Sequence, residues 1–549
     1  MRCTPLSILI LLLSALTPGF SQSDIVALKV IMKGKGTVIP DSPPPYRVGQ
    51  TITLSFSPSG GAQFSTKPDV PVAAETDSLF GWVFDHWSYS EHSEQSGSGL
   101  DNPLTITLQK DMDLHVTFLP MGTAAHPNPT QYQQLKAISE GRYEGWTTLS
   151  PSQQKGIGEK ARHYRDEYLH YNEKWGQPAT VWWEDFQRKV PFGYDYLGEG
   201  TTWAGLHLQA LALQYSVMPD DVENQQAILR VLEALDRNSL IMGVPGRVAR
   251  FSGPTDDKAY HWYYKDVKVG AFQGHAPWED MTWLGKPTRD THTGLFTGLA
   301  TVAALCRDHA KIYDLARTLT ERVVDRLIED QWKIKGIQKG YQALNEKSLK
   351  QLQMRVAYQF NPEKYSHFKK DIDNFTLKLK EGKGLYENLY WVEWMTWARA
   401  FGTIILESSP EKRQQYILQV NGFFEKKVNH LNPYYTGITC YLNSLNNNSS
   451  MEEGLYDKSR ALLEGLLLAF PDGIKWHREV NLFEDGRFEA KDEKHVVTAV
   501  LPNQRVNADF NAQRSAARAK GGGNRQSYQF TNFDMYLLYW LGRAGGRLP

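Results

Sequence analysis

The hydrophobic period of the chain changes once, about a fifth of the way along its 549 residues, and this change limits the folds open to it. Before that point apolar and polar residues alternate in short runs such as TITLSFSP (51–58), separated by Gly, Pro, Asp and Ser. After it apolar residues recur every three or four positions. Alternation is typical of strands and the longer spacing of helices. We therefore predict a small all-β module at residues 24–120, a linker at 121–130 and a helical domain at 131–549.

The helical domain contains segments of two kinds. TGLFTGLATVAAL is apolar on nearly all sides, whereas DDVENQQAILRVLEALDRN has one apolar and one charged face. We expect helices of the first kind to be buried and those of the second kind to cover them. Pairing each buried helix with the amphipathic helix after it predicts a mainly α fold, an (α/α) toroid of helical hairpins. The predicted helices are 151–174, 201–217, 221–240, 293–305, 309–329, 346–358, 386–404, 410–428, 434–445, 453–469 and 532–544.

The first residues predict the compartment. A short basic start at Met1 and Arg2 precedes an apolar run at 6–16 that is too short to span a bilayer, and small residues follow at 19–23. This pattern is typical of a secretory signal peptide covering residues 1–23. We expect the mature protein to be secreted, periplasmic or extracellular and not to be an integral membrane protein.

Charge and cysteine content exclude several kinds of partner. Lys plus Arg and Asp plus Glu each number 61, so no net field attracts nucleic acid. The two cysteines of the mature chain, Cys306 and Cys440, lie in apolar helical patterns, which favours buried thiols over a disulfide bridge. The spacing of Cys, His and acidic residues is not that of a zinc or EF-hand site, so we expect neither a metal nor a cofactor.

Both parts of the chain resemble known families. The order KGKGTV, YRVGQTITLSFSP, FGWVFDHWS, NPLTITL and DLHVTF resembles a divergent internalin-type B-repeat, a module of secreted and surface proteins of bacteria. The stretches YLGEGTTWAGLHLQALALQY and WLGKPTRDTHTGLFTGLATVAALC are similar to those of secreted, mostly bacterial proteins with a six-hairpin toroid. The second resemblance implies an (α/α)6 toroid related in architecture to glycosidases, and by analogy carbohydrate as the substrate.

Polar and aromatic residues gather where loops pass into buried helices. The start of a helix presents unpaired N–H groups and positive dipole, which suit a carboxylate or a substrate oxygen. In a toroid such junctions meet around one axial pocket. The residues at the first two junctions are Glu199 and Trp203, and Arg289, Asp290 and His292.

Paired carboxylates would suit glycosidic hydrolysis, which needs one carboxyl group as acid and another as base or nucleophile. We predict Glu199 and Asp290 as the pair and Asp534, which starts another apolar helix, as the reserve carboxylate. Asp290 and Thr202 have a simpler alternative role as helix caps, the commonest use of Asp and Thr at such positions. Glu199 is a poor capping residue and lies between two glycines, so capping explains it less well.

Other candidate ligands of a sugar chain follow these helices. Arg247 and Arg250 could bind carboxylate or sulfate groups through their planar guanidinium groups. The alternative is an ion pair with Asp256, Asp257 or another acid.

Two further loops carry candidate residues. The aromatic loop AYHWYYKD contributes His261 and Tyr263, and the glycine-rich loop before the last helix contributes Arg514. The second loop could close over the pocket as a lid.

Three functions remain open on the sequence. We predict a secreted glycoside hydrolase acting on a poly- or oligosaccharide. A polysaccharide lyase would use Arg247 or Arg250 to neutralise a uronate and a Tyr or His to remove a proton. A non-catalytic glycan-binding or adhesion protein, associated with a cell surface or matrix through the β module, is the third.

Overall fold

The computed structural model describes most of the chain between residues 25 and 548. The predicted signal peptide and the predicted linker at 121–130 lie outside the described residues. The described residues are 25–33, 36–58, 82–91, 96–99, 103–120, 137, 149–183, 191–195, 199–255, 270–338, 340–343, 345–380, 387–428, 431–445, 453–470, 489–491, 496–498, 528–529, 534–546 and 548.

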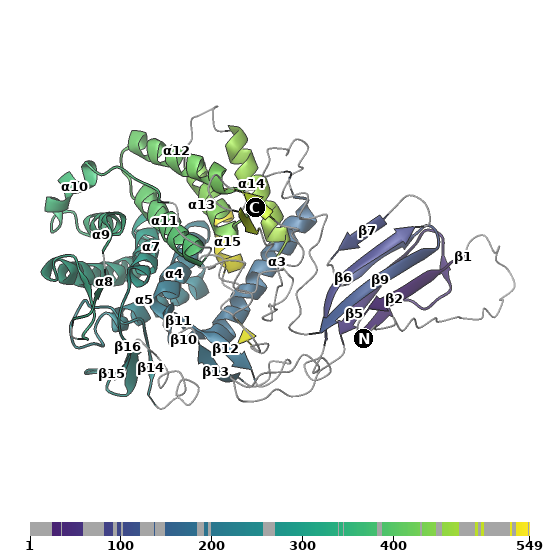
Figure 1. The fold of residues 1–549 in the computed structure, drawn as a ribbon, viewed down its shortest axis with the longest axis horizontal. Helices are drawn as coiled ribbons and strands as arrows, with labels where there is room; N and C mark the ends of the chain where they lie inside the picture. The colour runs from purple at the N-terminus through teal and green to yellow at the C-terminus, as the bar shows by residue number, and fades with distance from the viewer. Residues whose placement is uncertain are drawn as a thin grey trace.

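The N-terminal part consists of strands, as predicted (Figure 1). One sheet has the order β2-β9-β6-β7, a second has the order β3-β5-β8, and β1 pairs with β4. The pairing of β2 with β9 is parallel, and the others are antiparallel. The strands are β1 (Ile25–Val26), β2 (Leu28–Lys33), β3 (Gly36–Pro40), β4 (Tyr46–Arg47), β5 (Gln50–Pro58), β6 (Trp82–Glu91), β7 (Ser96–Gly99), β8 (Leu104–Leu108) and β9 (Met112–Pro120).

The alternation in these strands separates a core from a polar face. Ile52 and Leu54 of β5 are buried in one apolar cluster with Leu114 of β9. On the opposite face of β5, the hydroxyl groups of Thr51 and Thr107 lie 2.8 Å apart. Because successive side chains of a strand point to opposite faces, alternating residues place one face in the core and the other in solvent.

The C-terminal part is mainly helical, and each predicted helix is present (Figure 1). The helix predicted at 151–174 ends at Glu167 and is followed by a π-helical turn, Tyr168–Asn172, and the short helix at Lys369–Asp373 was not predicted. Within the described residues, no helix is both long and apolar enough to cross a membrane. The helices are α3 (Pro151–Glu167), α4 (Gly200–Val217), α5 (Val222–Asn238), α7 (Arg289–Leu305), α8 (Ala310–Glu329), α9 (Lys347–Phe360), α10 (Lys369–Asp373), α11 (Glu387–Ile405), α12 (Pro410–Lys427), α13 (Pro433–Ser444), α14 (Glu453–Leu468) and α15 (Asp534–Ala544).

Short strands between the helices were not predicted. They form two-stranded hairpins and two three-stranded sheets, of orders β13-β12-β21 and β14-β16-β15. The strands are β10 (Glu173–Lys174), β11 (Gln177–Pro178), β12 (Thr180–Trp183), β13 (Pro191–Asp195), β14 (Phe251–Pro254), β15 (Ala271–Gln273), β16 (Met281–Leu284), β17 (Ile334–Lys335), β18 (Gln342–Ala343), β19 (Glu489–Lys491), β20 (Val496–Thr498) and β21 (Tyr528–Gln529).

The two kinds of helix differ in burial as predicted. In α4 every residue from Gly200 to Tyr215 is buried, and in α7 every residue from Asp290 to Ala303 is buried. In α5 and α8 the buried residues recur at helical spacing along one face. Cys306 and Cys440 are buried thiols, as expected.

Glycines let α4 and α7 touch backbone to backbone. A Cβ atom at Gly294 would overlap the carbonyl of Thr202, and one at Gly298 would overlap the carbonyl of Gly205. Residue numbers rise together along this contact, so the two helices run in the same direction. Their amino ends therefore lie at the same end of the helical domain.

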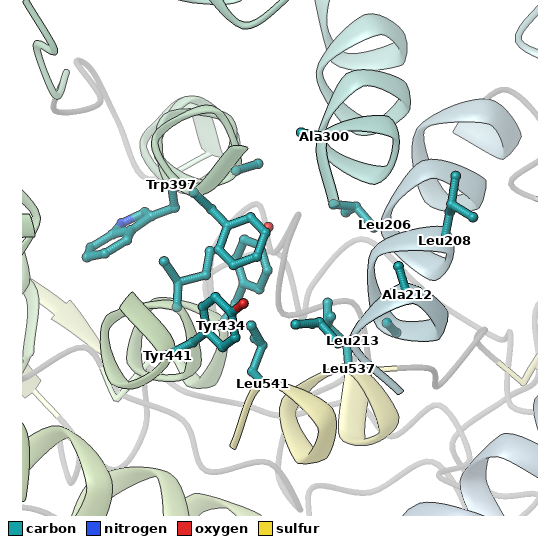
Figure 2. Packing of buried hydrophobic residues seen from close by; sticks show 14 of the residues in the cluster. Leu206, Leu208, Ala212, Leu213, Ala300, Trp397, Tyr434, Tyr441, Leu537 and Leu541 are labelled. Atoms are coloured by element: carbon teal, nitrogen blue, oxygen red, sulfur yellow. The ribbon is translucent and has the colours of Figure 1, made fainter. Parts of the chain in front are cut away.

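Further contacts connect these two helices to three others. Arg399 of α11 donates to the hydroxyl of Thr293 in α7, with 2.9 Å between the heavy atoms. Trp397 of α11 stacks on Tyr435 of α13, with ring centroids 4.9 Å apart. Figure 2 shows apolar side chains of α4, α13 and α15 pointing toward one another in a shared core. The helices of the C-terminal part thus share one continuous interior.

We expect an alanine at Gly294 or Gly298 to destabilise the protein. The added methyl group meets backbone that cannot rotate away, and overpacking of this kind costs about 1–3 kcal/mol. Gly422 of α12 is the matched control, because a Cβ there meets no described atom within 4 Å. Gly422→Ala should leave the free energy of unfolding unchanged or raise it by up to about 1 kcal/mol. If Gly294→Ala and Gly298→Ala changed the free energy of unfolding, measured in denaturant, no differently from Gly422→Ala, the close packing of α4 on α7 would be contradicted.

Candidate functional site

Glu199 stands at the amino end of α4, in the N-cap position. Among the described residues, its carboxylate accepts no hydrogen bond from the N–H groups of the first turn of α4 and instead forms an ion pair with Arg250. The hydroxyl of Thr202 donates to the other carboxylate oxygen, at 3.0 Å. The sequence alternative that Thr202 acts as the helix cap is therefore wrong, because this threonine lies inside the helix and binds Glu199.

The position of Arg250 is fixed by backbone hydrogen bonds on both sides. Its N–H donates to the carbonyl of Leu284 in β16, at 2.9 Å, and its carbonyl accepts from the N–H of Thr201 in α4, at 2.8 Å. The side chains of Arg250 and Glu199 are 11% and 16% exposed, so the pair lies near the surface and in contact with solvent. Together the β14–β16 sheet and the start of α4 hold a charged pair at one place.

Asp290 lies at the amino end of α7, the end that α4 and α7 share. The cap of α7 is Thr288, whose hydroxyl accepts from the N–H of Thr291 in a capping box. The sequence alternative that Asp290 serves as the cap is therefore wrong. The carboxylate instead lies 3.9 Å from the Nε atom of Arg289, and its side chain is 11% exposed.

Tyr341 is a member of the site that the sequence did not indicate. Its hydroxyl donates to the carbonyls of Lys286 and Pro287, at 3.1 and 2.7 Å. These carbonyls directly precede the cap of α7, so the tyrosine holds the loop that leads to Asp290. It is a single tyrosine in a loop about 50 residues further along the chain, and nothing in its local sequence predicts that contact.

The pKa of Tyr341 responds to the charged residues at the starts of both α4 and α7. Burial raises the pKa of the Tyr341 hydroxyl, Arg250 lowers it, and Asp290 and Glu199 raise it further. The net shift is upward, so the hydroxyl is protonated at neutral pH. A group that responds to all three charges lies within their electrostatic reach. We therefore group Glu199, Arg250, Asp290 and Tyr341 as one electrostatic cluster at the shared end of α4 and α7.

A second ion-pair network borders this cluster. Glu346, in the N-cap position of α9, accepts from Arg289 and from the buried Arg399, both at 2.7 Å. Burial alone would raise the pKa of Glu346, but the two arginines outweigh it and lower the pKa. Arg289, which we predicted as a substrate ligand, is 36% exposed and is the most accessible of the three side chains.

Trp203 does not present a face to a ligand, contrary to the prediction. It is 3% exposed and packs beside Trp394 of α11, with ring centroids 5.9 Å apart. Because α4 is buried on all sides, an aromatic residue in its first turn enters the core.

His292 is also part of the interior, contrary to its prediction as a substrate ligand. It is 2% exposed, its Nδ1 atom lies 3.4 Å from the amide nitrogen of Gln353, and its ring stacks near Phe296. Burial lowers its pKa to about 3. The imidazole is therefore neutral at physiological pH.

Arg247 binds an acid of the protein, so its predicted role toward substrate is corrected. Its Nε and Nη2 atoms each lie 3.1 Å from an oxygen of Asp330, and it also donates to the carbonyl of Gly336. Lys335 binds the same carboxylate at 3.0 Å. This bidentate pair fixes the segment that leads to Tyr341.

The side chains of the four remaining predicted residues lie outside the described part of the chain. His261, Tyr263 and Arg514 lie outside the described residues. Asp534 is the first residue of α15, and its side chain is likewise outside them.

The start of α15 nevertheless has a definite neighbour. Tyr536 donates to Gln214, near the carboxyl end of α4, and its ring centroid lies 6.3 Å from that of His207. The start of α15 therefore lies beside the part of α4 between His207 and Gln214 and not beside Glu199.

Comparison with known proteins adds no family to this geometry: no family model matches the chain, and no match was found among curated proteins. In the described part of the chain, no group of three or more His, Cys, Asp or Glu residues is arranged to hold a metal ion.

The buried His292 makes stability depend on pH. Its folded pKa of about 3 lies below the unfolded value near 6.5, so its contribution is complete above about pH 6.5 and is lost as the pH falls toward 3. We expect His292→Gln to reduce the slope of unfolding free energy against pH between pH 4 and 6 by about 1.4 kcal/mol per pH unit. The same change at the exposed His367 controls for loss of one histidine. An unaltered slope in denaturant titrations would show that His292 is not buried as a neutral ring.

Proposed function

We propose that the protein is a secreted glycoside hydrolase in which Glu199 and Asp290 are the two reacting carboxyl groups. The observation that carries the proposal is the common location of these acids, 91 positions apart in the sequence, at the amino ends of two parallel helices. Hydrolysis of a glycosidic bond requires two carboxyl groups on either side of it. Neither acid caps its helix, so the commonest structural role does not account for them.

The surroundings of the acids suggest a division of roles. Glu199 is paired with the guanidinium of Arg250 and accepts from the Thr202 hydroxyl, and both contacts favour a charged carboxylate. A charged carboxylate suits the base or nucleophile. Asp290 would then be the acid that protonates the leaving oxygen. Its contact with Arg289, at 3.9 Å, is longer than a hydrogen bond and favours the charged form less than the close pair of Glu199 does.

We also propose that the helical domain is an (α/α)6 toroid with this cluster at one mouth. The contacts of α7 with α4 and α11, of α11 with α13, and of α15 with both α13 and α4 support that order of neighbours. The alternation of fully buried and amphipathic helices supports it as well.

The N-terminal features suggest where the enzyme works. The basic and apolar start of the sequence supports export from the cytoplasm. The β module, if it is a B-repeat, would associate the enzyme with a cell surface or an extracellular matrix. Its core is separate from that of the helical domain, which suits a spacer or tether.

One observation favours a polysaccharide lyase as the second candidate. Arg250 and Tyr341 belong to the same cluster, and a lyase pairs a cation that neutralises a uronate with a group that takes a proton. The raised pKa of Tyr341 keeps its hydroxyl protonated at neutral pH, and that hydroxyl already donates to two carbonyls, so it is poorly placed to take a proton from a substrate. Hydrolysis therefore remains the first proposal.

The test compares the full-length mature protein with Glu199→Gln and Asp290→Asn on a panel of neutral and acidic polysaccharides. We expect each variant to lower kcat by about 10²- to 10⁴-fold while remaining folded, because general acid–base catalysis contributes about that factor. Release of reducing ends measures turnover, and ultraviolet absorbance detects the unsaturated uronate that a lyase would leave.

Glu407→Gln is the matched control. Glu407, just after the carboxyl end of α11, also pairs with an arginine, Arg355, at 2.9 Å, but both side chains are buried. This variant should lose stability and keep its turnover per folded molecule. Full activity of both Glu199→Gln and Asp290→Asn would overturn the assignment, unsaturated products would favour the lyase, and glycan binding without turnover would favour the adhesion protein.

A further inference from the structure

An exposed tryptophan lies at the tip of a hairpin that packs on α5. Strands β10 and β11 pair antiparallel and are joined by Trp175 and Gly176 (Figure 1). Trp175 is 47% exposed and is the only tryptophan among the exposed large hydrophobic residues of the described chain. Burying an indole is strongly favourable, so a chain that leaves one in solvent has a feature to be explained.

The backbone at this tryptophan is strained. Trp175 and Gly176 have φ angles of 58° and 76°, the pattern of a type I′ turn. Such turns favour Asn-Gly, since a bulky residue at positive φ is an outlier. Residues held in such conformations cluster at functional sites. The exposed side chain of Trp175 and its positive φ therefore both lower the stability of the folded protein.

The surrounding contacts hold the backbone of Trp175 and Gly176 in place. The carbonyl of Trp175 accepts from Arg237 at 2.8 Å, and the same guanidinium donates to the Ser252 hydroxyl at 2.9 Å. Gly176 lies directly on the backbone of α5 at Arg230. The backbone at the tip of the hairpin is therefore held by hydrogen bonds and by packing against α5.

The same contacts tie the hairpin to the end of α4 that carries Glu199. Gln177 donates to the carbonyl of Ser252, two residues after Arg250, at 2.9 Å. Asn238 donates both to Gln177, at 2.7 Å, and to Thr201 in the first turn of α4, at 2.8 Å. The hairpin and the amino end of α4 are thus joined by one set of hydrogen bonds.

We propose that Trp175 is a binding platform for a saccharide chain whose next rings extend to the site at Glu199. A single indole matches the apolar face of one sugar ring, whereas a protein partner would require several hundred Å² of apolar surface. Near it, the half-exposed Arg230 binds Glu173 through its Nε atom, and the ammonium of Lys174 lies over the ring of Tyr194. The inference rests on the proposed function in that it makes the substrate a polymer rather than a single sugar.

The test separates binding from stability. Trp175→Asn is made in the full-length Glu199→Gln protein, which should not consume the probes: a soluble glucan, a xylan, a mannan and a polyuronate. We expect affinity for at least one probe, measured by affinity electrophoresis and calorimetry, to fall by about 3- to 10-fold. Asparagine tolerates positive φ, so the midpoint of thermal unfolding should be unchanged or about 1–2 °C higher.

Trp332→Asn is the matched control. Trp332 also has a positive φ, 59°, but its ring packs against Phe368 and under the Lys350 ammonium. This variant should lower the unfolding midpoint and keep the affinity, the reverse of Trp175→Asn.

Two results would overturn the platform: unchanged affinity in Trp175→Asn, or failure of all four probes to bind the Glu199→Gln protein. If Trp175→Asn loses affinity but the unmodified protein shows no turnover, the binding role of Trp175 is supported and the proposal of a hydrolase is contradicted. If turnover depends on Glu199 but not on Trp175, the proposal of a hydrolase is supported and the binding role of Trp175 is contradicted.

Discussion

The backbone contact between α4 and α7 is the constraint on which the candidate site depends. Gly205, Gly294 and Gly298 leave no Cβ atoms between the two helices, so their axes approach as closely as backbone atoms allow. Close approach fixes the offset of one helix along the other. The loops that enter the two helices are then brought to the same end, and with them Glu199 and Asp290. A methyl group at this contact would separate the helices and the acids with them.

Charge pairing at that end follows a repeated pattern. Glu199 and Glu346 both occupy N-cap positions, and both direct their carboxylates to arginines. Glutamate is a poor cap because its longer side chain reaches past the first N–H groups, and the same length lets it reach a guanidinium on a neighbouring element. The helix starts are therefore joined to the sheet at Arg250 and to α11 at Arg399 by ion pairs. These links join the helix starts to neighbouring elements and favour the charged forms of Glu199 and Glu346.

The residues that sequence reasoning placed wrongly share a physical cause. Trp203 and His292 follow polar loops, and so resembled ligands, but each lies one turn inside a helix that is buried on all sides. Arg247 resembled a ligand for an anion, and its anion is Asp330, 83 positions later. Tyr341 and Trp175 were missed for the opposite reason, since their roles come from contacts with distant segments or from the shape of a turn. Local pattern does not distinguish a polar group that faces solvent from one that faces another helix.

The sequence by itself determined the elements and their kinds. Apolar periods of two and of 3.6 residues distinguished the strands from the helices. The width of the apolar stripe distinguished the buried helices α4 and α7 from the amphipathic helices α5 and α8. Both signals are local, because each element is buried through its own side chains. Only the tertiary structure decided which charges meet. The partner of Glu199 is Arg250 and the cap of α7 is Thr288 because helix offset and loop path, which depend on contacts between distant segments, set the few ångströms that an ion pair or a cap requires.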